Sequence, residues 1–467
     1  HYTRSIDVGG KLMTVPNLFS LANVEPASGK RDQGYLRTRN VAFFASAELG
    51  WKNMLYLSAT GRCDWASQLV SNGDTPSIGL SGIISEMVKL PEFISYLKLR
   101  TSYTEVGSPI TQTGITPGTV TDPMSGGVIN PISTYPYPDF KPERTKSYEV
   151  GINARFLNGR ISFDGTFYQS NTYNQTFLSV MSPATGYSGF YVQAGNVRNR
   201  GVEMTLGYND TFGKVNYSTH LTYTANQNKI VEMVHDYRNP IDNSLVNITE
   251  LTLKEAGDVY LREGYSMSDV FTTGILQRGR DGKLVEEGNG YQVDRSQRIR
   301  LGSADPDFTM GWRHDINYKN ISLGLMITGR FGGIVTSQTQ AFMDAFGVSK
   351  VSAEARDNGG VMLDGHRYDA ERYYNTVGGQ GLMSYYTYDA TNVRLQELSL
   401  TYSLPKKWLG DVFNNATISF VGRNLFMFYR KAPFDPDMNG STGTYNRSDF
   451  FMAPSLRNLG FSIKFSL

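Results

Sequence analysis

Tyrosines cluster in segments that are rich in Gly, Asp and Pro, residue types that favour loops over strands. A tyrosine ring is rigid and carries a polar tip, so it can stack on the face of a sugar or grip a peptide. The residues that we expect to contact a substrate on this basis are Tyr135, Tyr137, Arg372, Tyr373, Tyr374, Tyr385, Tyr386 and Tyr388. The alternative is that these tyrosines pack one loop against another, or lie in an aromatic girdle at a membrane interface.

No other group of residues in the chain has the spacing of a reactive site. The five histidines are scattered, without the spacing of a zinc site, and the acidic segment 281–287 lacks the alternating ligands of a calcium loop. Neither a glycine-rich phosphate loop nor a nucleophile elbow is present. We therefore expect no catalytic residue, no bound metal and no cofactor. The formal net charge of +2 gives no reason to expect a nucleic-acid partner.

The last nine residues indicate which kind of element holds these loops. Leu459, Phe461, Ile463, Phe465 and Leu467 alternate with Gly, Ser and Lys. An extended strand points alternate residues to opposite faces, so this segment has one fully apolar face and one wet face. Such a strand suits a wall between lipid and a water-filled lumen. No segment approaches the about 20 apolar residues of a membrane helix, and barrel strands give a weaker signal than such helices.

The same alternation recurs in pairs of segments joined by short turns, which predicts β-hairpins. The predicted strands are Asn40–Trp51, Met54–Asp64, Ser77–Ser85, Tyr96–Glu105, Tyr148–Phe156, Arg160–Tyr168, Gly201–Tyr208, Val215–Asn226, Met310–Tyr318, Ile321–Arg330, Val393–Leu404, Ala416–Phe428 and Leu459–Leu467. The phase of one strand slips near Gln396 and Glu397, which predicts a β-bulge there. A β-sandwich would also alternate and is the main structural alternative.

The phase of each strand predicts which side chains face lipid and which face the lumen. We expect the lipid face to carry Leu97, Leu99, Phe461, Ile463 and Phe465. We expect the lumen to carry Lys98, Arg100, His220 and Lys464. His314 shares the phase of Trp312 and should lie near a membrane interface, because polar groups are costly at mid-bilayer.

Long and short connections alternate along the chain, as they do in outer-membrane barrels. The long connections are predicted at 107–142, 170–197, 228–308, 331–391 and 429–456. The last strand of such a barrel ends in the periplasm, and successive strands alternate in direction. Counting the 13 strands back from the C-terminus therefore places residues 1–38 outside the cell and residues 39–467 in the barrel with its outer loops. The chain begins His1-Tyr2 without a methionine or a signal peptide, so we expect it to be processed or incomplete at this end.

Several segments, in order along positions 39–467, resemble the SusC-like branch of TonB-dependent outer-membrane importers. The similar segments are Ser95–Tyr103, Lys141–Gly151, Phe156–Arg160, Asn196–Glu203, Asp389–Pro405, Gly422–Phe426 and Asp435–Asp437. The resemblance implies an all-β fold: a transmembrane antiparallel β-barrel whose about 13 strands here form the C-terminal part of a plugged barrel of about 22 strands. The plug, the TonB-contacting segment and the first strands of that family are absent from this sequence.

The resemblance also implies the function, the location and the partners. It implies uptake of oligosaccharides or oligopeptides through the outer membrane of a Gram-negative bacterium, without an enzymatic reaction. The implied partners are the N-terminal part of the same barrel with its plug, a SusD-like surface lipoprotein, the TonB complex, membrane lipid and lipopolysaccharide. Importer–lipoprotein pairs are also expected to dimerise. We expect the lipoprotein to dock chiefly on loops 228–308 and 331–391.

Two other functions fit the sequence. A siderophore or cobalamin receptor of the same superfamily would need no lipoprotein lid. A secreted all-β enzyme or carbohydrate-binding protein would be soluble without detergent, so solubility separates it from a barrel.

Overall fold

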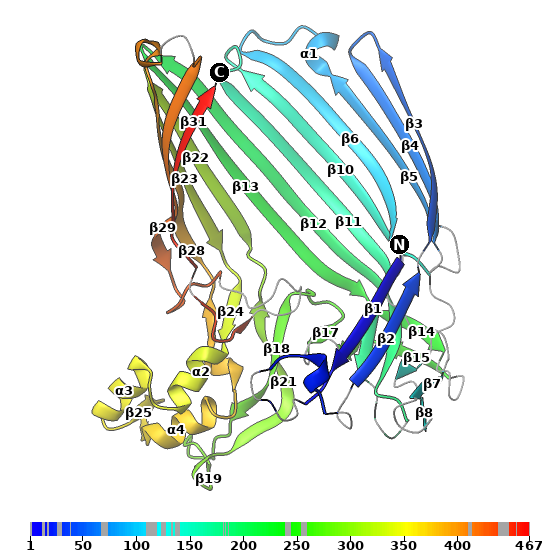
Figure 1. The fold of residues 1–467 in the computed structure, drawn as a ribbon, viewed down its shortest axis with the longest axis vertical. Helices are drawn as coiled ribbons and strands as arrows, with labels where there is room; N and C mark the ends of the chain where they lie inside the picture. Colours follow the sequence, from blue (N-terminus) through cyan, green and yellow to red (C-terminus); the bar gives the residue numbers. More distant parts are fainter. Residues whose placement is uncertain are drawn as a thin grey trace.

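A tall, curved antiparallel sheet makes up most of the computed structural model, and its long loops gather at one end (Figure 1). Short turns join the strands at the opposite end (Figure 1). The structure describes residues 2–11, 15, 18–25, 30–37, 39–66, 73–108, 119–122, 128–131, 134–135, 141–180, 182, 184, 186–238, 244–253, 259–409, 413–437, 448–453 and 455–466.

Thirteen strands pair in sequence order to form the wall, each antiparallel to its neighbour. They are β3 (Asn40–Trp51), β4 (Leu55–Ala66), β5 (Gly73–Ile83), β6 (Ile94–Ser108), β10 (Glu143–Phe156), β11 (Ile161–Val180), β12 (Gly189–Phe212), β13 (Val215–Glu232), β22 (Phe308–Tyr318), β23 (Ile321–Phe331), β28 (Asn392–Ser403), β29 (Asn415–Arg430) and β31 (Asn458–Ser466). The predicted hairpins, their order and the all-β barrel class are confirmed. Tight turns explain the short connections: Lys52 and Asn53 both have positive φ (51° and 56°), the conformation of a hairpin turn whose twist matches its strands.

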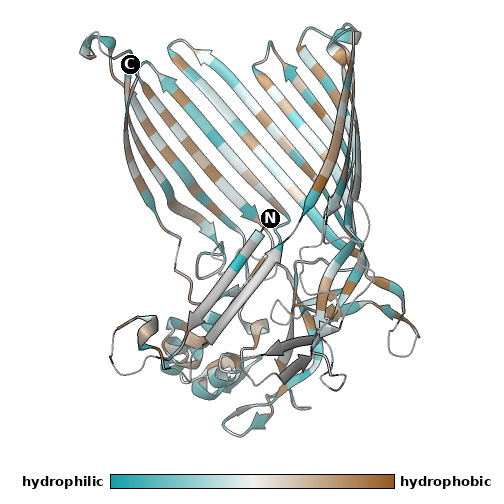
Figure 2. Cartoon of the chain, turned by 45° about the vertical axis from the view of Figure 1, so that its right-hand side comes forward, coloured by the Kyte–Doolittle hydropathy of each residue, from teal (hydrophilic) through white to brown (hydrophobic). Residues whose placement is uncertain are grey.

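The polarity of the two sheet faces follows the predicted phase. One row across five adjacent strands is apolar, and it contains Ile316, Leu323, Leu400, Phe420 and Phe461. The next row is polar, and it contains Asn317, Ser322, Thr401, Ser419 and Ser462. Figure 2 shows the alternation of hydrophilic and hydrophobic residues along the strands.

The register also agrees with the predicted faces at the named positions. Leu97 and Leu99 pair with Ala154 and Ile152 in the apolar rows, whereas Lys98 pairs with Asn153 in a polar row. Residues of the polar face, among them Glu48, Ser58, Ser102 and Glu149, line a hollow of about 480 Å³ on the sheet. The polar face is therefore the concave, luminal one.

The predicted bulge is also confirmed, whereas the location of His314 near a membrane interface stays a prediction. Gln396 has no register partner on β23 or β29, which is the predicted bulge. His314 lies on the apolar face beside Trp312, with 4.4 Å between the ring centroids. The imidazole Nδ1 and the Tyr217 hydroxyl are 2.8 Å apart, so the polar ring has a partner on a face that otherwise suits lipid.

The predicted loop at 170–197 is wrong in its bounds. β11 continues to Val180 and β12 begins at Gly189, so these two strands have 20 and 24 residues. A tilted strand needs only about 9–11 residues to cross the bilayer, so the hairpin extends beyond it. The period-two pattern ends at the membrane edge because both faces then contact water, although the backbone ladder continues.

The remaining connections fold into small elements, four of which are α-helices that the sequence pattern did not predict. The helices and 3-10 turns are η1 (Leu21–Asn23), α1 (Ile84–Met87), α2 (Gln338–Ala345), α3 (Lys350–Asp357), α4 (Ala370–Val377), η5 (Met383–Tyr385) and η6 (Lys406–Trp408). The small strands are β1 (Tyr2–Gly9), β2 (Lys30–Arg37), β7 (Thr119–Asp122), β8 (Val128–Pro131), β9 (Thr134–Tyr135), β14 (Val234–Arg238), β15 (Leu245–Ile248), β16 (Glu250–Thr252), β17 (Tyr260–Arg262), β18 (Asp269–Leu276), β19 (Glu286–Glu287), β20 (Gly290–Tyr291), β21 (Val293–Ser303), β24 (Ile334–Ser337), β25 (Val361–Leu363), β26 (His366–Tyr368), β27 (Thr387–Asp389) and β30 (Ser448–Asp449). No described helix combines the length and the apolar composition needed to cross a bilayer.

The wall is open along two edges. Within the described residues β3 pairs only with β4, and β31 pairs only with β29. β1 and β2 form a separate two-stranded hairpin, which both views place beyond the strand ends where the long loops begin (Figures 1 and 2). The assignment of residues 1–38 to an outer loop stays a prediction.

Candidate functional site

The long connections after β13 and β23 fold together into one packed unit, which we call the outer loop body (residues 269–303 and 334–390). Its core joins side chains from both connections: Leu276, Leu284, Tyr291, Ala341, Tyr368, Ala370, Tyr373, Tyr374, Val377, Leu382 and Tyr386. Three N-caps fix its helices. Ser337, Ser349 and Asp369 accept backbone hydrogen bonds from Gln340, Ser352 and Arg372, over distances of 3.0, 3.0 and 2.9 Å.

Three of the predicted substrate-contacting tyrosines lie inside this core. Tyr373, Tyr374 and Tyr386 are only 8%, 8% and 3% exposed. Burial raises the pKa of the Tyr373 and Tyr386 hydroxyls, which are held neutral in a dry environment. Their position supports the alternative in which these rings pack loop against loop.

Of the other predicted residues, Tyr385 and Tyr388 pack against the edge of the same core. The Tyr385 hydroxyl accepts a hydrogen bond from the Leu276 backbone N–H (3.1 Å). Tyr388 packs edge-on against Phe434, and burial raises its pKa to about 12. β9, which contains Tyr135, pairs with β12, and Tyr137 lies outside the described residues.

Arg372 is half-buried. Its guanidinium lies over the Tyr291 ring at 5.3 Å and forms an ion pair with Glu286 at 3.3 Å. This arrangement ties α4 to the β19–β20 hairpin. The carboxylate of a ligand would have to compete with Glu286 for the same guanidinium.

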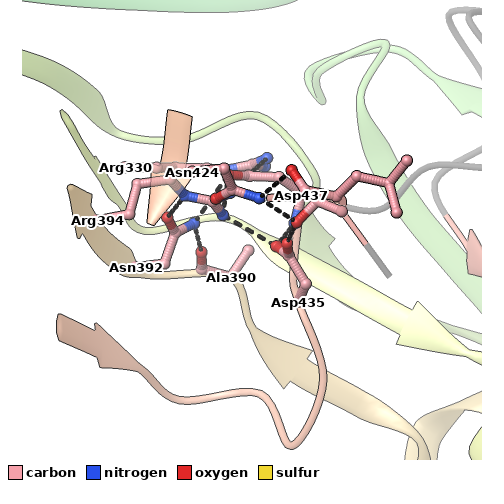
Figure 3. Close-up of polar contacts among 9 residues, drawn as sticks. Arg330, Ala390, Asn392, Arg394, Asn424, Asp435 and Asp437 are labelled. Carbon is pink, nitrogen blue, oxygen red and sulfur yellow. Dashed lines mark hydrogen bonds and ion pairs between the residues drawn. The ribbon is translucent and has the colours of Figure 1, made fainter. Parts of the chain in front are cut away.

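A polar cluster at the base of the loops joins charged side chains of β23, β28 and the segment after β29 (Figure 3). Arg394 on β28 is 6% exposed and donates to Asp435 (2.9 Å) and Asp437 (2.6 Å). Arg330 on β23 forms an ion pair with Asp437 at 3.4 Å and donates to the Ala304 carbonyl. Asn392 donates to Asp437 and to the Ala390 carbonyl.

This cluster fixes where the last long loop leaves the wall. Burial by itself would raise the pKa of Asp435, but hydrogen bonds from Ser455 and Arg394 outweigh it and hold the pKa below its ordinary value. In the sequence, Asp435 and Asp437 are recognisable only as part of the resemblance to SusC-like importers. The signal that could have identified the pairing is Arg394, a charge on the luminal phase of an otherwise well-patterned strand.

The luminal face pairs many of its own charges across strands. Arg100 donates to Asp164, two strands away, at 2.8 Å. It crosses Gly151, where a Cβ would lie 2.5 Å from Arg100 Nε, so a glycine is needed beneath the guanidinium. His220 and Ser218 lie 3.2 Å apart on the same face. These groups offer a polar, hydrated wall and no reactive arrangement.

Comparisons with known proteins agree with this geometry. The family described as TonB dependent receptor-like, beta-barrel matches residues 7–328. A TonB-dependent receptor, P3, of Formosa agariphila is 24% identical over 97% of this chain and 48% of its own length. The TonB-dependent receptor SusC of Bacteroides thetaiotaomicron is 24% identical over 94% of this chain and 45% of its own length.

A solved structure shares the fold over almost the whole chain. The structure of the RagAB peptide transporter superimposes with a TM-score of 0.73 at 16% identity, covering 97% of this chain and 50% of that one. The chain therefore spans about half the length of the relatives that it matches.

Proposed function

The chain belongs to the family of TonB-dependent receptor-like β-barrels, and on this basis we propose that it forms the C-terminal wall and outer loops of a SusC-like nutrient importer. The barrel lies in the outer membrane of a Gram-negative bacterium. Oligosaccharides or oligopeptides are the proposed cargo. The likeness to SusC and to the RagAB peptide transporter supports this choice of cargo class.

The rest of the barrel is the first proposed partner. β3 and β31 present backbone edges without a partner in the described part of the chain, and an open edge is not viable in lipid. Strands from the N-terminal half of the same protein would close the wall on both edges. That half would also carry the plug and the segment that contacts TonB.

A SusD-like lipoprotein is the second proposed partner, docked on the outer loop body. The observation that carries this proposal is an exposed apolar surface formed by α2, the turn after it and the segment after β30. Phe346, Val348 and Phe451 are 77%, 71% and 62% exposed. Phe342 lies 5.8 Å from Phe451 between ring centroids, so the side chains of two loops form one patch. Exposed apolar patches of this kind favour protein partners.

The test is co-purification of the lipoprotein with the full-length importer. We expect Phe346→Ser/Val348→Ser to reduce lipoprotein recovery at least tenfold while the barrel stays in the outer membrane. The control Ile275→Ser/Met362→Ser removes two exposed apolar side chains elsewhere on the same body and should leave recovery unchanged. Full recovery with the patch variant would rule out this docking surface. A protein that never co-purifies with a lipoprotein would instead favour a lidless siderophore or cobalamin receptor.

A further inference from the structure

The outer face of β10–β13 changes from apolar to cationic within two rows of residues. Three successive lipid-facing rows carry no charge; the outermost of them contains Val150, Phe167, Val202 and Ala225. The next row contains Tyr148, Gln169, Arg200 and Gln227. The row after that contains Lys146, Asn171, Arg198 and Lys229. The strands therefore leave the apolar layer and enter a basic band, which we define as Lys146, Arg198, Arg200 and Lys229.

One acidic residue shares the outer row: Glu105 on β6 is the register partner of Lys146, and its carboxylate pairs with Arg144. The row keeps an excess of positive charge. None of the four residues of the basic band forms an ion pair with a described residue, whereas the nearby Arg144 is paired with Glu105 at 2.9 Å. Arg198 and Lys229 are direct register partners on β12 and β13. Like charges that face each other across two strands destabilise a sheet, so this arrangement favours an anion from outside the chain.

The position of the band indicates what that anion is. Tyr148 and Tyr103 pack together just below it, with 4.9 Å between ring centroids. Tyrosine rings at the edge of an apolar layer are typical of the membrane–water interface. The band faces away from the lumen, so neither the plug nor the transported substrate reaches it. At this height the available groups are the headgroups of the outer leaflet.

We propose that the basic band binds the phosphate groups of an anionic lipid in the outer leaflet. Lys146 and Arg198 are half-buried, with the Lys146 ammonium 5.8 Å from the Tyr173 ring, and Arg200 and Lys229 are exposed. Arg200 is oriented by its hydrogen bond to Gln227 at 2.8 Å. Two cations on adjacent strands can bind one phosphate from both sides, which removes their mutual repulsion. The proposal rests on the location of the barrel in the outer membrane, and it is independent of the cargo.

The test measures binding of purified lipopolysaccharide to the full-length importer in neutral detergent. Arg198→Gln/Lys229→Gln should weaken binding about thirtyfold, from about 1 kcal/mol for each basic residue near a charged bilayer surface. Lys146→Gln/Arg200→Gln is a second variant at the same band and should act in the same direction. The control Lys214→Gln/Lys319→Gln removes two charges from turns at the opposite end of the strands and should leave the affinity unchanged.

Three outcomes of the binding measurement would overturn the proposal. They are equal affinity of both band variants and the wild type, equal binding of lipopolysaccharide whose phosphates have been removed, and competition by inorganic phosphate at the same concentration, which would mean a simple anion site. Lipoprotein recovery is measured in parallel. If the lipoprotein is lost only from the band variants, the band belongs to the protein partner and the lipid assignment is overturned. If no lipoprotein is recovered with the wild type or with any variant, the result counts against the proposed importer and leaves the lipid result intact.

Discussion

The barrel wall and the outer loop body use the same apolar residue types in opposite ways. In the wall, Phe43, Leu49 and Phe461 are each 68% exposed to the surroundings of the chain. In the outer loop body, Val377 and Leu382 are fully buried against other side chains. One region satisfies its backbone by strand pairing and leaves its apolar side chains for lipid. The other builds a core of its own, as a water-soluble domain does.

This difference follows from the two solvents around the chain, which are lipid at the wall and water at the outer loops. In lipid, backbone hydrogen bonds decide stability, because apolar side chains gain nothing by leaving a hydrocarbon environment. In water, burial of the apolar side chains decides it. The cluster around Arg394 lies where the two regions meet, so variants there and on either side separate the two regimes.

The largest effect is expected at the junction. Arg394→Ala leaves Asp435 and Asp437 without their main cation, and loss of one partner from a buried pair costs about 3–5 kcal/mol. Hydrogen exchange of the 431–437 backbone in the full-length protein measures this loss. Arg423→Ala is the control, because the Arg423 side chain in its pair with Glu397 is 63% exposed, and we expect less than about 1 kcal/mol there.

Acidic pH tests the same junction. The pKa of Asp435 is held below its ordinary value in the folded protein, so its contribution to stability is present above the unfolded pKa of about 3.9. It is lost as pH falls through the lower, folded pKa. Protection of residues 431–437 should therefore be constant from neutral pH to about pH 5 and fall below about pH 4.

In a triple variant that combines Arg394→Ala with Asp435→Asn and Asp437→Asn, most of the stability cost of Arg394→Ala should disappear. A cost that persists in the triple variant would mean that Arg394 acts through packing.

An identical substitution in each region gives the next effect. Leu382→Ala should destabilise the outer loop body by about 3 kcal/mol, because a buried truncation adds a cavity to the lost transfer energy. Leu400→Ala on the lipid face should cost less than half as much, since fluid lipid fills the space. Leu400 is 50% exposed. Proteolysis of the loops and heat stability of the barrel measure the two effects separately, and equal costs at both sites would remove the distinction between the regions.

The last pair of substitutions probes the wall alone. Ile463→Arg on the lipid face of β31 should cost about 2–4 kcal/mol if the residue lies near the midplane. Ser462→Arg on the luminal face should be mild, because water reaches it. The equilibrium between folded barrel and unfolded chain in lipid vesicles gives both values. Similar costs at positions 462 and 463 would contradict the assignment of the two faces.

The sequence predicted the wall well and the outer loops poorly, for one physical reason. In the wall, each residue's environment depends on whether its position is odd or even within a strand, so local order alone separates Leu99 from Arg100. The bulge at Gln396 could be predicted because it breaks that same rule. Beyond the membrane the rule ends, and the long β11–β12 hairpin was therefore placed too short.

The outer loop body depends on contacts that no local pattern records. Tyr373 and Tyr386 were expected to contact a substrate because rigid rings with polar tips suit sugars and peptides, and loop-against-loop packing was the alternative. The structure buries them against Leu276 and Leu284, which come from another connection about 100 residues away in the sequence. Ser337, Ser349 and Asp369 cap the short helices that follow them, but helices of this length are held mainly by this packing.

The barrel class, the order of the strands and the face of the strand residues could be predicted from local sequence, because period-two alternation and turn residues act over a few neighbours. The tertiary structure alone decided the pairing of Arg394 with Asp435, the passage of Arg100 over Gly151 to Asp164, and the basic band across β10, β12 and β13. Each of these depends on register between strands or on loops that return from far along the chain. Register and loop packing are set by the sum of many contacts, which no single segment contains.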